Sequence, residues 1–258
     1  MSIWRLIDTG RDSAPWNMAV DEALLDLFRE GEWPILRLYG WRPSLSFGRF
    51  SKPLQSVDLT LAKERGVSCV RRITGGGILV HGGDLSYSII LPSSFAKEEG
   101  VKGSYRFLCR FLIRLYEKLG LDAGFVTQFK KEEKESNICL AGSEAYDILI
   151  DGMKMGGNAQ RHTKKAMLQH GSIPIYFDRD MLEPLFLEDS GLKEAASLCD
   201  LGVERDYDAL STLLVNTFCE TFGVKVKPDV LKSGEVRRAK ELLKRKYTSE
   251  RWTLYGRE

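Results

Sequence analysis

The sequence predicts an α+β protein, in which a mixed β-sheet is flanked by helices. Segments typical of strands outnumber those that a strict alternation of strands and helices would provide, and many follow one another directly in the chain. Only a few segments carry a long amphipathic helical pattern. This order of elements favours a mixed sheet over a doubly wound parallel one.

The first half of the chain is expected to contain five strands and two helices. The first helix should begin after Ser13, because serine is a frequent N-cap and Pro15 suits the first turn. Its apolar residues recur at helical spacing up to Gly31. A short helix is expected at 58–65, and strands are expected at 3–8, 35–41, 45–50, 67–73 and 85–92.

The second half is predicted to begin with a long helix that is capped by Ser104 and ends at Gly120. The Asp151-Gly152 pair predicts a β-hairpin within 145–160, because Asp-Gly favours a tight two-residue turn. Further elements are a charged loop at 127–137, a strand at 167–177, helices at 178–186 and 206–222, and a basic helix at about 233–246. No repeat or linker interrupts the pattern, so residues 1–258 are interpreted as one domain.

Composition excludes several classes of protein. The chain has 258 residues with 38 basic and 36 acidic side chains, and this balance gives no reason to expect a nucleic-acid partner. No apolar run is long enough for a membrane span, and the N-terminus lacks the apolar core of a signal peptide. The five cysteines are scattered and odd in number, so neither a disulfide framework nor a metal site is expected. A cytoplasmic protein is the resulting expectation.

Two arginines, Arg71 and Arg72, directly precede a run of three glycines, 75–77. Glycine lets backbone N–H groups approach a ligand closely, so one interpretation is an anion-binding loop. The alternative is a flexible turn with two solvated arginines. The spacing matches neither the dinucleotide-binding glycine motif nor the P-loop.

Four further residues have the chemistry of a reactive site. Cys139 lies among small residues after the charged loop, where a neighbouring cation would stabilise its thiolate. Lys154 is followed by Gly156 and Gly157, which suggests close approach of a ligand, although a lone strand lysine is usually a solvated charge. His81 and His170 each precede a glycine at a strand edge, and neither has partners spaced for a metal site.

Four stretches occur in the order found in the lipoate/biotin protein ligase superfamily: RPSLSFGRF, VRRITGGGILVHGGDLSYSI, SNICLAGSEAYDILIDGMKMGGNAQ and LQHGSI. The chain most resembles the cysteine-dependent octanoyltransferases of the LipM type, over about residues 4–222. The resemblance implies an α+β catalytic domain. It also implies transfer of an octanoyl group from acyl carrier protein to a lysine of a lipoyl-domain protein, such as the glycine-cleavage H protein. No cofactor, membrane or second subunit is implied.

The same resemblance assigns roles to residues. The family has a cysteine fifteen residues before a lysine in a Gly-x-Lys-x-x-Gly context, and Cys139 and Lys154 match this spacing. These two are the expected catalytic residues. The remaining matched positions are expected to bind the substrate: Arg72, Gly75, Gly76, Gly77, His81, Tyr87, Gly156, Gly157, Asn158, His170 and Gly171.

Other functions stay open. Transferases of this type usually have arginine where this chain has Gly77, and glycine there is more typical of lipoate–protein ligases, which bind ATP with Mg²⁺ and lipoate. A transferase between two lipoyl domains and a non-catalytic carrier-binding protein are further alternatives. No residue is identified as the base that deprotonates the acceptor lysine, for which His81 and His170 are the candidates.

Overall fold

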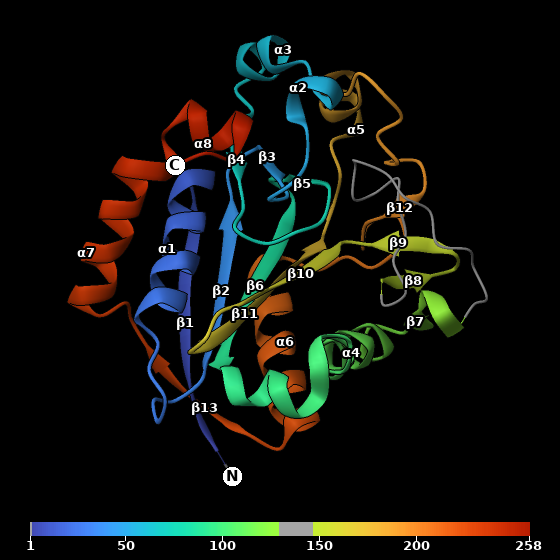
Figure 1. Cartoon of the computed structure of the whole chain (residues 1–258). Coiled ribbons are helices and arrows are strands. Elements are labelled where there is room, and N and C mark those ends of the chain that lie inside the picture. Colours follow the sequence, from blue (N-terminus) through green and yellow to red (C-terminus); the bar gives the residue numbers. More distant parts are fainter. Residues whose placement is uncertain (1, 129–146) are drawn as a thin grey trace.

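The computed structural model describes residues 2–128 and 147–258. In this part of the chain the largest sheet has six strands in the order β10-β11-β6-β2-β1-β13 (Figure 1). β1 pairs in parallel with both β2 and β13, whereas β2, β6, β11 and β10 pair antiparallel. The predicted mixed sheet is therefore confirmed. The strand bounds are β1 Ile3–Asp12, β2 Ile35–Trp41, β6 Asp84–Pro92, β10 Gly157–His162, β11 Ala166–Pro174 and β13 Lys225–Asp229.

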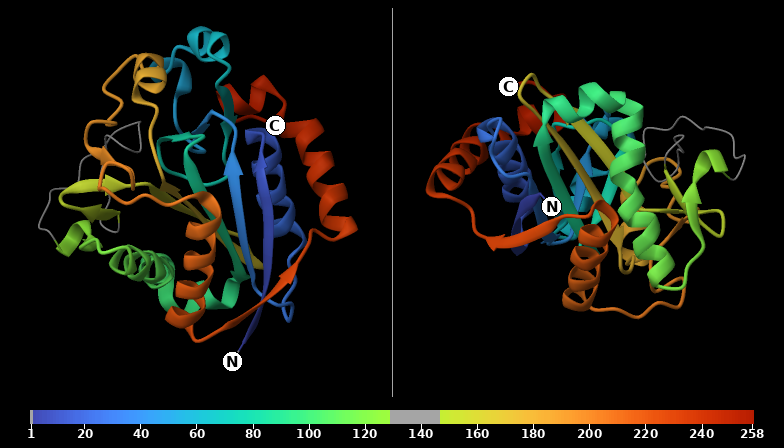
Figure 2. Two further views of the ribbon diagram at one scale, coloured as in Figure 1. Left: turned by 180° about the vertical axis from the view of Figure 1, so that it is seen from behind. Right: turned by 90° about the horizontal axis from the view of Figure 1, so that it is seen from below.

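Helices cover both faces of this sheet (Figure 2). α1 and α7 pack on one face, and α4 and α6 pack on the other. The alternation of β6 explains this arrangement, because successive side chains of a strand point to opposite faces. Tyr87 and Ile89 belong to the core under α4 and α6, whereas Ile90 belongs to the core under α1. The helix bounds are α1 Ala14–Leu27, α4 Ser93–Lys118, α6 Tyr207–Phe222 and α7 Ser233–Leu242.

One of two predicted helix starts is confirmed. Ser13 occupies the N-cap of α1 as predicted, although its side chain makes no capping hydrogen bond. The long helix was predicted from residue 104, and this start is wrong, because α4 already begins at Ser93. Its geometry is interrupted only at Gly100, where φ is 70°. Ser104 lies inside the helix and donates to the Val101 carbonyl, so it is not a cap.

Two smaller sheets stand beside the main one. The first has the order β4-β3-β5 (β3 Ser44–Phe47, β4 Ser68–Arg71, β5 Ile78–His81), and the second has the order β12-β9-β8-β7. The bounds in the second are β7 Ala123–Phe125, β8 Ile148–Ile150, β9 Met153–Met155 and β12 Ala195–Ala196. The hairpin predicted around Asp151-Gly152 is confirmed, since it joins β8 to β9 with positive φ at both turn residues.

Short helices complete the fold. They are α2 Pro53–Ser56, α3 Leu59–Glu64, α5 Arg179–Leu182 and α8 Glu250–Tyr255, with 3₁₀ turns at Val126–Gln128 and Glu183–Leu185. The predicted basic helix corresponds to α7 and the π-helical turn Leu243–Tyr247 that continues it. No helix among the described residues combines the length and apolar character needed to cross a bilayer.

Arg71 joins the C-terminal segment to the three-stranded sheet. Its side chain is buried at the end of β4. It donates to the carbonyl oxygens of residues 252, 253 and 254 in α8, and to those of residues 48, 49 and 51 after β3. One guanidinium therefore satisfies backbone acceptors from two segments that are about 200 residues apart in the chain.

We expect Arg71→Met to lower the free energy of unfolding by at least about 3 kcal/mol, because it leaves several buried carbonyls without a donor. Urea unfolding measures the change. Arg65→Met is the matched control, since this exposed arginine also donates to two carbonyls, of Asp180 and Met181. Equal losses in the two variants would contradict the role assigned to Arg71.

Candidate active site

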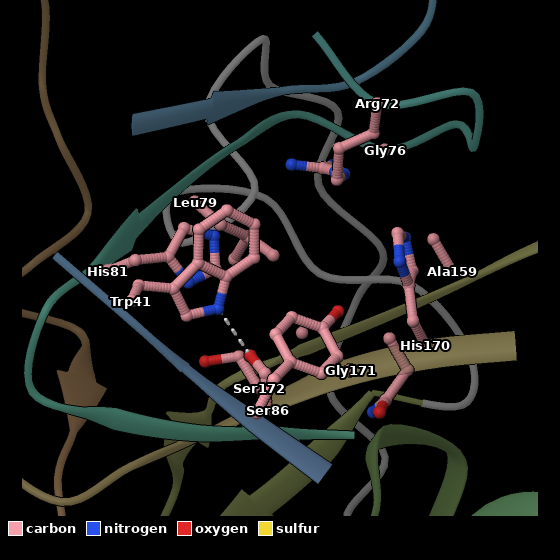
Figure 3. A pocket seen from close by; sticks show the side chains of 13 residues that line it. Trp41, Arg72, Gly76, Leu79, His81, Ser86, Ala159, His170, Gly171 and Ser172 are labelled. Carbon is pink, nitrogen blue, oxygen red and sulfur yellow. Dashed lines mark hydrogen bonds between the residues drawn. The ribbon is translucent and has the colours of Figure 1, made fainter. Parts of the chain in front are cut away.

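A pocket lies between the three-stranded sheet and the face of the six-stranded sheet that α1 also covers (Figure 3). It encloses about 350 Å³ of space that is partly open to solvent. Aromatic and small side chains dominate its walls. The lining residues are Tyr39, Trp41, Arg72, Gly76, Leu79, His81, Ser86, Gly157, Asn158, Ala159, His170, Gly171 and Ser172.

The structure brings most of the predicted substrate-binding residues to this pocket. Seven of them line it, namely Arg72, Gly76, His81, Gly157, Asn158, His170 and Gly171. Gly75 and Gly77 flank Gly76 in the loop between β4 and β5. Tyr87 lies in the core on the other face of β6, and its hydroxyl donates to Asn158 Oδ1 at 2.7 Å. Tyr87 therefore positions a residue of the pocket wall.

The glycine loop is held by Arg72. This arginine is 3% exposed, so the alternative of two solvated arginines is wrong. Its Nη1 donates to the carbonyl and to Oγ of Ser46, at 2.6 and 2.7 Å. Its Nη2 donates to the carbonyls of Gly75 and Gly77, at 3.2 and 3.0 Å. These donors point at the protein's own backbone, which favours a structural role over the anion-binding interpretation.

His81 belongs to a buried chain of hydrogen bonds below the loop. Its Nδ1 lies 2.9 Å from Asp84 Oδ2, and its Nε2 lies 2.7 Å from Ser46 Oγ. A carboxylate only accepts, so we assign the ring proton to Nδ1 and the acceptor role to Nε2. The ring also stacks on Trp41 with centroids 4.0 Å apart. Ser46 thereby connects His81 to Arg72.

His170 forms a second chain of this kind on the other side of the loop. Its Nδ1 lies 3.0 Å from Asp21 Oδ2, and its Nε2 lies 2.7 Å from Thr74 Oγ1. Burial lowers the pKa of His170, although the hydrogen bond to Asp21 acts in the opposite direction. Burial alone would raise the pKa of Asp21, but Arg37 at 2.6 Å and His170 bring it below its ordinary value. The neutral imidazole of His170 thus links the charged carboxylate of Asp21 to Thr74 at the start of the glycine loop.

Both histidines therefore use both ring nitrogens within the protein. Neither presents a free nitrogen to the pocket in this arrangement. Their geometry is that of positioning residues, with Asp84 and Asp21 as fixed anchors. The role of base, considered for His81 and His170, gains no support from these contacts.

Two of the predicted glycines lie where a Cβ would clash. A Cβ on Gly156 would lie 1.9 Å from the Ser172 carbonyl oxygen, and its φ is +62°. The obstacle there is backbone, so no larger residue fits. A Cβ on Gly171 would lie 2.0 Å from Asn158 Oδ1, so the Asn158 side chain would have to move.

Lys154 is buried on β9, at 5% exposure, and its Nζ lies 2.6 Å from Asp147 Oδ2. The interpretation as a solvated surface lysine is therefore wrong. Lys154 is not among the residues that line the pocket, but Gly157 follows it by three positions and does line it. Cys139 lies outside the described residues, so its predicted position beside Lys154 stays a prediction.

Two other cysteines, Cys69 and Cys109, have thiols that burial makes less acidic. Burial raises the pKa of the Cys69 thiol to about 12 and also raises that of Cys109. Cys109 belongs to the core under α4. Thiols of this kind remain protonated at neutral pH and are poor nucleophiles.

Sequence reasoning missed the aromatic wall and the carboxylates behind it. Tyr39 and Trp41 alternate on β2, and Ser86 and Ser88 alternate on β6, so strand periodicity places each pair on one face. Strand periodicity therefore predicts which face of the sheet these residues share, but it does not predict the pocket. Asp21 carries no local motif, because its partners Arg37 and His170 come from distant segments. The partners of Asp84 include His81 and Ser86, which are close in the sequence.

A comparison with known protein families identifies the family of this chain. Residues 13–227 match the model of the lipoyl protein ligase A/B catalytic domain, so the chain belongs to that family. A relative from Macrococcus caseolyticus named octanoyltransferase LipM is 35% identical over 96% of this chain and 97% of its own length. Another protein of that name, from Kyrpidia tusciae, is 34% identical over 98% of both chains.

Solved structures agree on the fold. A lipoate-protein ligase A with bound ATP matches with a TM-score of 0.84 and 28% identity, covering 98% of this chain and 99% of that one. A putative lipoate protein ligase from T. acidophilum with bound lipoic acid matches with a TM-score of 0.84 and 27% identity, covering 98% and 100%. The predicted fold type is confirmed.

The lowered pKa of His170 predicts a pH effect on stability. The unfolded chain takes up a proton on this histidine near pH 6.5, whereas the folded protein does so only at lower pH. The free energy of unfolding should fall as pH drops below about 6.5, by at most about 1.4 kcal/mol per pH unit from this group. His170→Gln should lose that contribution.

Urea unfolding between pH 7.5 and 5.5 measures both slopes. His162→Gln is the comparison variant, because the His162 imidazole is only partly buried and its pKa is lowered by that burial alone. It should flatten the slope less than His170→Gln. Identical slopes in wild type and His170→Gln would contradict the buried neutral state.

Proposed function

We propose that this protein is an octanoyltransferase of protein lipoylation. The observation that carries the proposal is the buried Lys154, which is paired with Asp147 at the position where the family has its lysine. The likeness to octanoyltransferases over nearly the whole chain supports it. The donors of Arg72 support it further, since they hold the loop instead of facing a phosphate.

The reaction would take place in two steps. The thiolate of Cys139 attacks the thioester carbonyl of octanoyl–acyl carrier protein, and the carrier's sulfur leaves as a thiolate. The neutral amine of a lysine on a lipoyl-domain protein, such as the glycine-cleavage H protein, then attacks the new thioester. The Cys139 sulfur leaves, an amide forms, and the proton that the amine loses balances the charge of the departing sulfur. Conversion of a thioester to an amide is downhill, so no ATP, metal or other cofactor is required.

Lys154 would serve both steps electrostatically. A buried ammonium stabilises the oxyanion of each tetrahedral intermediate, and it also favours a nearby thiolate. Asp147 holds the lysine in place and supplies a counter-charge 2.6 Å from its Nζ. The pocket would receive the alkyl chain between Trp41 and the glycine loop. We place the enzyme in the cytoplasm as a monomer.

A lipoate–protein ligase is the second candidate. Gly77 favours it, since glycine there is typical of the ligases, and two similar structures are ligases with bound ATP or lipoic acid. In that case Mg-ATP would be a substrate, and the glycine loop would face an acyl-adenylate. Cys139 would then have no chemical role.

The mass of the intact protein after incubation with octanoyl–acyl carrier protein separates the two candidates. We expect an octanoyl adduct that hydroxylamine removes and that Cys139→Ala lacks. Cys109→Ala is the control, because this buried thiol should not be acylated. No adduct, together with ATP-dependent lipoylation by Cys139→Ala, would establish the ligase instead.

Asp147→Asn tests the ion pair of Lys154. Removal of the carboxylate takes away the counter-charge that lies 2.6 Å from Lys154 Nζ, in a buried position. If this ion pair positions the ammonium for the reaction, the rate of acyl transfer should fall. Asp151→Asn changes an exposed carboxylate in the same hairpin and should leave the rate in place. An unchanged rate in Asp147→Asn would show that the pair does not control the reaction.

A further inference from the structure

An exposed apolar groove lies between α2 and α8, apart from the pocket described above. Its walls are residues 49–55 together with Leu254 and Tyr255, and it encloses about 820 Å³ that is open to solvent. Three large apolar side chains stand out on its rim, with exposures of 82% for Phe50, 51% for Leu54 and 60% for Tyr255. Contiguous exposure of large apolar groups is typical of an interaction surface.

The groove is also positively charged. Arg49, Lys52 and Arg71 line it, and none of the described residues in its walls is acidic. Residues 233–258, which supply Tyr255, contain eight basic and four acidic residues, whereas the whole chain is nearly balanced. One of the acids, Glu258, is paired with Lys246 at 2.6 Å. Such a surface attracts an acidic partner and speeds its encounter.

The groove is connected directly to the glycine loop of the pocket. The N–H of Gly48 donates to the Gly77 carbonyl at 3.0 Å, and the N–H of Arg49 donates to the Thr74 carbonyl at 2.7 Å. Arg71 and Arg72 are consecutive, so their side chains leave the end of β4 in opposite directions. Arg71 lines the groove and Arg72 lines the pocket. The groove is therefore on the far side of the loop that bounds the pocket.

This geometry restricts the occupant. A partner seated in the groove must pass its reactive group around the glycine loop to reach the pocket. A lysine side chain on a folded acceptor domain is short and must meet the acyl carbonyl directly. A thioester on a long flexible prosthetic arm can follow that path.

We propose that the groove docks the acyl donor, a small acidic protein domain that carries the octanoyl group on a flexible arm. This inference rests on the proposed transferase function. Phe50 and Tyr255 would supply the apolar anchors, and Lys52 with the basic C-terminal segment would supply charge complementarity. The acceptor domain would approach the pocket by another route.

The test is the double variant Phe50→Ser, Lys52→Glu. Its KM for octanoyl–acyl carrier protein should rise by about tenfold or more, as expected for loss of an aromatic anchor and reversal of a charge. Its rate with octanoyl-pantetheine, which lacks the carrier domain, should stay at the wild-type value. Val230→Ser is the control, because this side chain is 75% exposed in the β13–α7 connection, away from α2 and α8.

Three results would overturn the proposal. They are an unchanged KM for the carrier, an equal loss with octanoyl-pantetheine, and a rise in KM for the lipoyl domain instead. Direct binding of the carrier domain, followed by fluorescence anisotropy, makes the test independent of the reaction. Wild-type binding that the double variant weakens supports the groove even if no acyl-enzyme forms. Absence of wild-type binding refutes it.

Discussion

The glycine loop between β4 and β5 depends on two buried arginines that donate to backbone carbonyls on its two sides. Arg72 donates to the carbonyls of Gly75, Gly77 and Ser46, and Arg71 donates to carbonyls of α8 and of the chain after β3. A guanidinium has five donors in a fixed plane, so it can join segments that share no strand pairing. Without these contacts the three consecutive glycines would be free to adopt many backbone conformations.

The two histidine chains extend this support into the six-stranded sheet. Asp84 also accepts from Ser86 and Ser172, and Asp21 also accepts from Arg37, Tyr39 and Ser88. Each carboxylate is buried but fully engaged, which is the condition under which burial of charge is tolerated. The histidines that line the pocket are thus held in place by hydrogen bonds to these buried carboxylates. A preorganised site of this kind costs little rearrangement when a substrate binds.

Local patterns predicted much of the fold. The strands that became β2, β6 and β11 were all predicted, β6 from its alternation, and Asp151-Gly152 identified the hairpin that carries Lys154. The start of α4 was missed because Gly100 and the charged residues before it hide the helical period. β5 and β13 were missed because they are short, and because their pairing with β3 and β1 is decided by tertiary contacts.

The candidate site, like the fold, was predicted only in part. Motif positions such as Arg72, Gly76 and His170 were predicted, and they do meet at one pocket. The burial of Lys154, the anchoring carboxylates and the groove beside α8 were not predicted. These depend on which distant segments meet, as when Arg71 reaches α8, and no sequence spacing records that. The resemblance to a family supplied roles that residue patterns alone left open.

The most direct test of the pocket's role is a crystal structure of the protein after acylation by octanoyl–acyl carrier protein. We expect an alkyl chain that extends from Cys139 into the pocket between Trp41, Gly76 and His170, with Arg72 still bound to the loop carbonyls. An alkyl chain bound elsewhere, with this pocket vacant, would contradict it.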